Sequence, residues 1–126
     1  MKNLGKLSET EMEVMEVIWD LATPVTVKQL LDIFDSKDWK TSTVSTILKR
    51  LIDKGFLTKS MNGKVNFYEP ALTWSEYKKY ETQTFLHRLY NGKVKNFIAA
   101  LVDDNELSQD DIAELKEWFV RKGGKK

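Results

Sequence analysis

Cysteine is absent from the 126 residues, which excludes disulfide bonds, thiolate metal sites and a cysteine nucleophile. Histidine occurs once, at His87, so little remains from which a metal site or a general base could be built. No apolar run reaches the roughly 18–20 residues that span a bilayer, and residues 1–6 lack the apolar stretch of a signal peptide. We therefore expect a cytoplasmic protein that has no cofactor, metal or membrane contact and is not an enzyme.

The charged residues are unevenly distributed, although the net charge is only +1. Residues 1–39 carry 4 basic and 8 acidic side chains, residues 40–70 carry 6 and 2, and residues 71–126 carry 10 and 9. A locally basic middle segment is what contact with a polyanion requires. The same charges are also compatible with an ordinary solvated surface, so the charge pattern alone leaves both interpretations open.

Four segments share a pattern that is typical of helix N-termini: an apolar residue, then Ser or Thr, then an acid or amide three positions later. The four pairs are Ser8 with Glu11, Thr26 with Gln29, Thr73 with Glu76, and Ser108 with Asp111. The hydroxyl can accept a hydrogen bond from a free N–H of the first turn, and the later side chain can accept one from the N–H of the capping residue. These pairs therefore predict where four helices begin.

Apolar periodicity extends this to six helices and one hairpin. We expect helices over 8–22, 26–34, 41–54, 73–90, 93–102 and 108–122. The apolar faces of the first three predict a core of Met12, Met15, Ile18, Trp19, Val27, Leu30, Leu31, Phe34, Val44, Ile47, Leu48 and Leu51. Residues 56–60 and 64–68 alternate as strands do, and Asn62-Gly63 between them predicts a tight turn because both residues tolerate positive φ.

The predicted fold is mainly α with a small β-hairpin. Three helices followed by a hairpin form a winged helix-turn-helix, so we expect a DNA-binding domain of this type over residues 1–72. The remaining residues, 73–126, form short amphipathic helices that cannot bury their apolar faces on each other alone. We expect these helices to be a dimerisation domain, and the protein to be a homodimer.

The helix over 41–54 carries the sharpest functional pattern. Opposite its apolar stripe lie Ser42, Thr43, Ser45, Thr46, Lys49 and Arg50, with no acidic residue before Asp53. Small hydroxyl side chains let a helix backbone approach base edges, and a Thr methyl can touch a thymine methyl. Lys49 and Arg50 can reach phosphates, as can Lys40 before the helix and Lys64 in the hairpin. These eight residues are the predicted contacts with double-stranded DNA. The alternative is a solvated polar face, although such faces rarely concentrate Ser and Thr, which are poor helix formers.

Several stretches together resemble the BlaI/MecI family of penicillinase repressors. They are residues 13–19, 37–44, 48–57 and 107–112, together with the hairpin that contains Tyr68. The resemblance covers nearly the whole chain. It implies a homodimer with N-terminal winged helices and intertwined C-terminal helices, which binds a palindromic operator and represses β-lactamase or resistance genes. It also implies a regulatory protease as a partner, which triggers cleavage in the dimerisation domain.

The chain departs from that family at three places. The stretch Trp-Ser-Pro-Lys before the recognition helix is here Trp39-Lys40-Thr41-Ser42, so a capping serine, a proline and a DNA-contacting lysine are lost. A longer side chain common further along that helix is here Ser45, so the operator sequence is expected to differ. The Asn-Phe cleavage pair aligns with Ala100-Leu101, and we therefore expect poor cleavage. The absence of cysteine argues against the copper sensing of one family branch.

Two other functions are compatible with a winged helix. One is protein–protein contact without DNA, which would favour exposed Leu, Met or aromatic side chains on the helix over 41–54 rather than Ser, Thr, Lys and Arg. The other is a regulator that senses a small molecule, which would require a pocket between the helices of the dimer.

Overall fold

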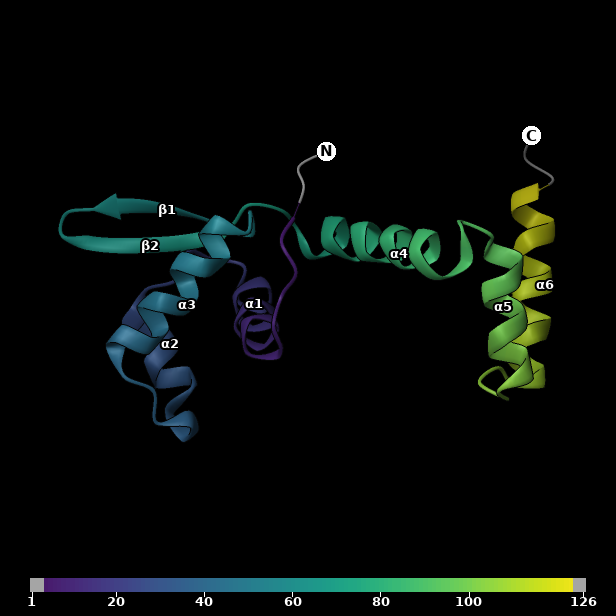
Figure 1. The fold of residues 1–126 in the computed structure, drawn as a ribbon, viewed down its shortest axis with the longest axis horizontal. Coiled ribbons are helices and arrows are strands. Elements are labelled where there is room, and N and C mark those ends of the chain that lie inside the picture. Colours follow the sequence, from purple (N-terminus) through teal and green to yellow (C-terminus); the bar gives the residue numbers. More distant parts are fainter. Residues whose placement is uncertain (1–3, 124–126) are drawn as a thin grey trace. The chain divides into compact units, whose positions relative to one another are not determined.

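The computed structural model describes residues 4–123, which form two compact units that divide between Tyr77 and Lys78. The first unit contains α1 (Glu9–Leu21), α2 (Val27–Ile33), the short 3-10 helix η1 (Asp35–Lys37), α3 (Thr41–Asp53), β1 (Leu57–Asn62) and β2 (Val65–Pro70). Helix α4 (Trp74–Tyr90) begins in the first unit and continues into the second, which also holds α5 (Val94–Asp103) and α6 (Gln109–Gly123) (Figure 1). The predicted fold class, mainly α with one hairpin, is confirmed.

All four predicted helix starts carry the reciprocal capping bonds. In each pair the hydroxyl accepts from the N–H three residues later, and the acid or amide accepts from the N–H of the capping residue, at 2.8–3.2 Å. Even Ser108, whose partner is the shorter Asp111, makes both bonds. Helices α3 and α5 begin differently, because their capping positions, Lys40 and Lys93, make no side-chain capping bond.

The core of the first unit follows the predicted apolar stripes closely in α3. Val44, Ile47, Leu48 and Leu51 are all buried, as are Met15, Ile18, Leu30 and Phe34. Four residues predicted to be buried are only partly so, although they pack against the core: Met12, Trp19, Val27 and Leu31. In α1 the inward face is centred about one position earlier than predicted, on Glu11, Val14, Met15 and Ile18. The prediction missed this because it did not place a charged side chain in the core.

The hairpin pairs in a register that corrects the predicted turn. Asn62 pairs with Val65, so the two turn residues are Gly63 and Lys64 rather than Asn62 and Gly63. Gly63 adopts a φ of +66°, whereas Asn62 is not among the residues with positive φ. Glycine at the first turn position is typical of the type II′ hairpin. Tyr68 of β2 also exchanges two backbone hydrogen bonds of 2.8 Å with Val25, and this bridge joins the segment between α1 and α2 to the hairpin.

The start of α4 belongs to the core of the first unit. Tyr77 is buried, and the ring centroid of Trp19 lies 5.1 Å from that of Tyr77 and 5.2 Å from that of Trp74. The Trp19 indole N–H donates to the Leu72 carbonyl at 2.9 Å. The predicted boundary at residues 72 and 73 therefore lies just before side chains that complete the winged-helix core.

The second unit differs from the first in how far its side chains are buried. Phe85, Tyr90 and Phe97 form a triangle of aromatic rings, with centroids 5.6–5.8 Å apart, which joins α4 to α5. None of the described residues of this unit is buried. Large apolar side chains remain exposed: Leu89, Val94, Val102, Trp118, Phe119 and Val120.

Candidate nucleic-acid interface

The outer face of α3 is formed by the residues that its buried stripe leaves outside. Because Val44, Ile47, Leu48 and Leu51 turn inward, the side chains between them turn outward. All six predicted helix contacts are exposed: Ser42, Thr43, Ser45, Thr46, Lys49 and Arg50. Lys40 and Lys64 are exposed as well. The structure thus brings seven of the eight predicted residues to one helix and its capping position, and places Lys64 in the hairpin turn.

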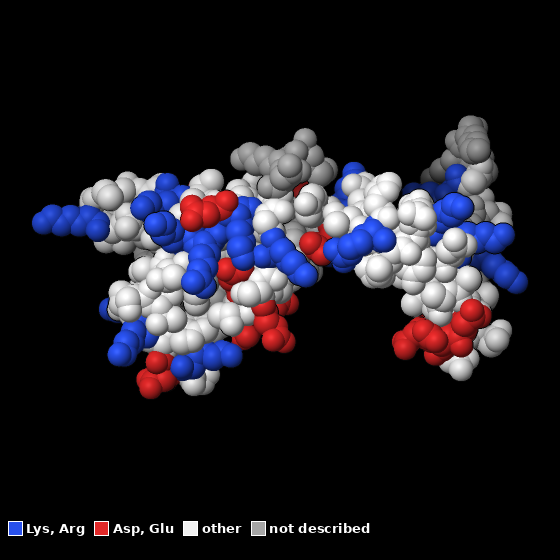
Figure 2. Space-filling model, in the orientation of Figure 1, with Lys and Arg blue, Asp and Glu red and all other residues white. Residues whose placement is uncertain are grey.

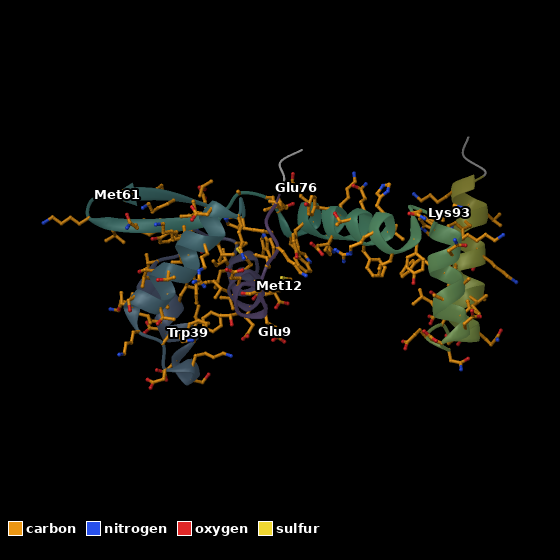
Figure 3. All side chains as sticks on the ribbon, in the orientation of Figure 1. Glu9, Met12, Trp39, Met61, Glu76 and Lys93 are labelled. Carbon is orange, nitrogen blue, oxygen red and sulfur yellow. The ribbon has the colours of Figure 1, made fainter. Side chains whose placement is uncertain are left out.

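The N-terminus of α3 is held by packing and not by a side-chain cap. Trp39 packs on Phe34, with ring centroids 5.0 Å apart, and Figure 3 shows Trp39 beside α2 and α3. Asp38, just before it, adopts a φ of +55° that turns the chain into the helix. The Lys40 carbonyl accepts from Thr43 and Val44. The side chain of Lys40 caps none of the first N–H groups, so no carboxylate or hydroxyl from the capping residue lies on the positive end of the helix dipole.

Thr46 has a defined orientation on this surface. Its hydroxyl donates to the Ser42 carbonyl at 2.9 Å, one helical turn earlier. This bond uses the only proton of the hydroxyl, so the side chain offers its methyl group and an oxygen lone pair to a ligand. Thr46 is consequently better suited to an apolar contact or to accepting a hydrogen bond than to donating one.

The basic side chains around this face are not neutralised by acids of the same chain. In the first unit, Lys37 forms an ion pair with Glu13 and Lys54 forms one with Glu11. Neither pair uses Lys40, Lys49, Arg50 or Lys64. Figure 2 shows many basic side chains over the hairpin and α3, with a few acidic ones among them, and a larger group of acidic side chains around α1.

Lys54 also belongs to the basic segment 40–70, but it stabilises the fold and is not one of the predicted DNA contacts. Its ammonium donates to the Lys6 carbonyl at 2.7 Å and to the buried carboxylate of Glu11 at 2.5 Å, which ties the end of α3 to the start of α1. Burial alone raises the pKa of Glu11, but the hydrogen bonds from Lys54 and Ser8 and the charge of Lys54 outweigh burial and hold this pKa below its ordinary value. Part of the local positive charge is therefore already used within the fold.

Other kinds of site are not evident in the part of the chain that the structure describes. Residues 4–123 contain no group of three or more His, Cys, Asp or Glu side chains placed to hold a metal ion. None of the helices in that range combines the length and the apolar character needed to cross a bilayer.

A family model described as the penicillinase repressor matches residues 7–120. The chain belongs to the penicillinase repressor family. This confirms the resemblance seen in the sequence motifs.

Individual members of the family match along almost the whole chain. The penicillinase repressor of Bacillus licheniformis is 33% identical over 115 residues, which cover 91% of this chain and 90% of that protein. The methicillin resistance regulatory protein MecI of Staphylococcus aureus strain N315 is 29% identical over 117 residues, which cover 93% and 95%.

Solved structures agree with the fold of the winged helix. The solution structure of the DNA-binding domain of the repressor BlaI has a TM-score of 0.52. That of the monomeric form of Bacillus licheniformis BlaI in complex with the blaP half-operator has a TM-score of 0.50. Each is 33% identical and covers 61% of this chain and 94% of its own.

The hairpin of this family member has a feature that the sequence reasoning missed. Met61 of β1 is 68% exposed and Val65 of β2 is 48% exposed, next to the turn that carries Lys64. The alternation of apolar and polar residues predicted a hairpin. In the structure, the buried part of β1 ends at Leu57, closer to the helices than that alternation suggests. The sequence carries no signal for the point at which the core ends along the hairpin, so it did not single out Met61.

Proposed function

We propose that this penicillinase-repressor family member is a sequence-specific transcriptional repressor that binds a palindromic operator as a homodimer. The regulated genes are of the β-lactam-resistance type, since the curated relatives are named as penicillinase and methicillin-resistance repressors. The protein acts in the cytoplasm and catalyses no reaction. Double-stranded DNA and a second copy of the chain are its main partners.

The outer face of α3 is the observation that carries the proposal. It presents four hydroxyl side chains and two cations, no acid before Asp53, and an uncapped helix start. A polar face that only needed solvation would not require this composition. Thr43 and Thr46 contact base edges, Lys49 and Arg50 contact phosphates, and the first N–H groups of α3 approach a phosphate oxygen. Lys40 and Lys64 add phosphate contacts at either side, and Ser42 and Ser45 allow the close approach.

The exposed apolar side chains of the second unit support the homodimer. Exposed apolar surface is characteristic of interaction sites, and Trp118, Phe119 and Val120 are three consecutive exposed apolar residues of α6 that gain from an apolar partner. A second copy of the chain provides this apolar partner through two-fold symmetry. The same symmetry presents two α3 helices to the two half-sites of an operator.

Regulation by a protease stays a prediction. The Ala100–Leu101 bond lies inside α5, and the helix must open locally before a protease can bind the chain there.

The decisive experiment separates base reading from phosphate binding. An operator is first selected from randomised duplexes, and binding to it and to a random duplex is then measured at several salt concentrations. Thr46→Ser removes the methyl and should weaken operator binding by roughly 1–2 kcal/mol with little effect on random DNA. Thr46→Val keeps the methyl and should be tolerated better. Arg50→Ala should weaken both DNAs alike and reduce the salt slope by about one ion.

Thr82→Ala, at an exposed threonine of α4, is the matched control and should change neither measurement. Equal loss on both DNAs for Thr46→Ser would show that α3 does not read sequence at this position. If neither Thr46 nor Arg50 variants change binding, α3 does not contact DNA.

A further inference from the structure

The outer half of the hairpin extends beyond the core of the first unit. Leu57 and Tyr68 are buried, but every side chain from Thr58 to Val65 is exposed. Figure 1 shows the two strands continuing past the helices of that unit, and Figure 3 places Met61 toward the end of the hairpin. A long apolar side chain at such a position gains nothing from the fold of the monomer.

The neighbours of Met61 carry positive charge and no negative charge. Lys59 lies two residues earlier in β1 and therefore on the same face as Met61. Lys64 occupies the turn, and the segment 58–65 contains no acidic residue. This arrangement complements a DNA groove, which has phosphates along its edges and exposes the apolar faces of stacked bases when a step is opened.

The end of the hairpin is also narrow. Gly63 has no side chain, and a Cβ placed there would meet nothing within 4 Å. A two-residue turn keeps this end small, and since the minor groove of B-DNA is only about 6 Å wide, single side chains of the hairpin enter it rather than the two-stranded ribbon itself. An apolar side chain inserted from that groove partly separates two stacked base pairs and bends the duplex.

We infer that Met61 acts as an apolar wedge at the minor groove beside the sequence contacted by α3, with Lys59 and Lys64 on the flanking phosphates. This inference rests on the proposed function and adds a second mode of sequence recognition to it. A wedge favours steps that unstack readily, so the protein selects flexible pyrimidine–purine steps at a position where it forms no hydrogen bond to a base. The unbranched thioether of methionine suits this role because it adapts to the shape of the opened step.

The test uses the full-length protein and operators that differ only at the flanking step, TA against AA. Bending is measured by energy transfer between dyes at the two ends of the duplex, and affinity by titration. The wild type should bend the DNA and prefer TA on the order of fivefold. Met61→Ala should lose both the preference and most of the bend, Met61→Leu should retain them, and Met61→Gln, of similar length but polar, should behave like Met61→Ala.

Val65→Ala is the matched control, because it shortens an exposed apolar side chain that neighbours the same turn. It should leave the bend and the step preference unchanged. If Met61→Ala keeps both, or if Val65→Ala removes them as well, the wedge assignment is wrong although operator binding stands. If the wild type selects no operator at all, the proposed function itself fails.

Discussion

The two units of this chain are built from similar amphipathic helices but use them differently. The first unit buries 14 apolar side chains, contributed by three helices, the hairpin, the start of α4 and the segments next to these elements. In the described part of the second unit no side chain is buried, although α5 and α6 are amphipathic and carry Trp118, Phe119 and Val120. Amphipathic periodicity therefore indicates that a helix has an apolar face, but it does not say whether the same chain covers that face.

The contrast between the two units requires that the buried core of the first unit stabilises a single chain by itself. Leu48 of α3 is fully buried, and Leu48→Ala should lower the free energy of unfolding by about 2–5 kcal/mol because it leaves a cavity. The effect should not depend on protein concentration. Denaturant titration of the winged-helix signal measures it, with Leu21→Ala, at a 40% exposed leucine of α1, as the matched control. Equal losses at both positions would contradict the burial pattern.

A substitution in the second unit should act on association. Phe119 of α6 is 49% exposed, and Phe119→Ala should raise the dissociation constant of the homodimer by about tenfold or more, since aromatic anchors often dominate interfaces. Glu117→Ala, two positions away and so on the opposite side of α6, is the control. Sedimentation at several concentrations distinguishes the two variants. A chain that stays monomeric at micromolar concentration before any substitution would refute the homodimer.

The smallest expected effect concerns the ion pair that joins α1 to α3. Because the pKa of Glu11 is lowered in the folded protein from its ordinary 4.5, the carboxylate stabilises the fold above that pH, and this contribution is lost as the pH falls through the lowered value. Glu11→Gln should therefore cost about 1 kcal/mol at pH 7 and progressively less in acid.

The exposed pair of Glu13 with Lys37 provides the comparison for that measurement. Both of its side chains are 42% exposed, so Glu13→Gln should change stability little at any pH. Thermal unfolding between pH 3 and 7 records both variants. A Glu11→Gln penalty that is constant across this range would show that the ionised pair contributes nothing specific.

Local sequence was enough to predict the six α-helices and the hairpin, although not the short 3-10 helix η1. The four capping pairs depend on residues three positions apart, so their geometry is contained in the sequence, and all four were found. The inward stripe of α3 was likewise predicted residue by residue. The hairpin turn was displaced by one residue, because Asn-Gly fits a turn in either register and the pairing of Asn62 with Val65 decides between them.

What the sequence could not predict depends on contacts between distant residues. The bond between Glu11 and Lys54 joins positions 43 residues apart, and it explains why the buried face of α1 includes a carboxylate. The exposure of Met61 depends on where the core ends along the hairpin, which alternation alone does not reveal. The eight predicted DNA contacts are all on the surface, and their assignment to bases and phosphates stays a prediction.

The uncapped start of α3 has a consequence for efforts to stabilise this protein. Lys40→Ser would supply the hydroxyl that the other capped helices use, a change worth about 1 kcal/mol at such positions. It would also delete a cation and occupy backbone donors at the end of the helix that faces a phosphate in the proposed complex. Stability and DNA binding therefore favour different residues at position 40. Selection for a more heat-resistant variant would favour serine there, and that change would lower the affinity for DNA.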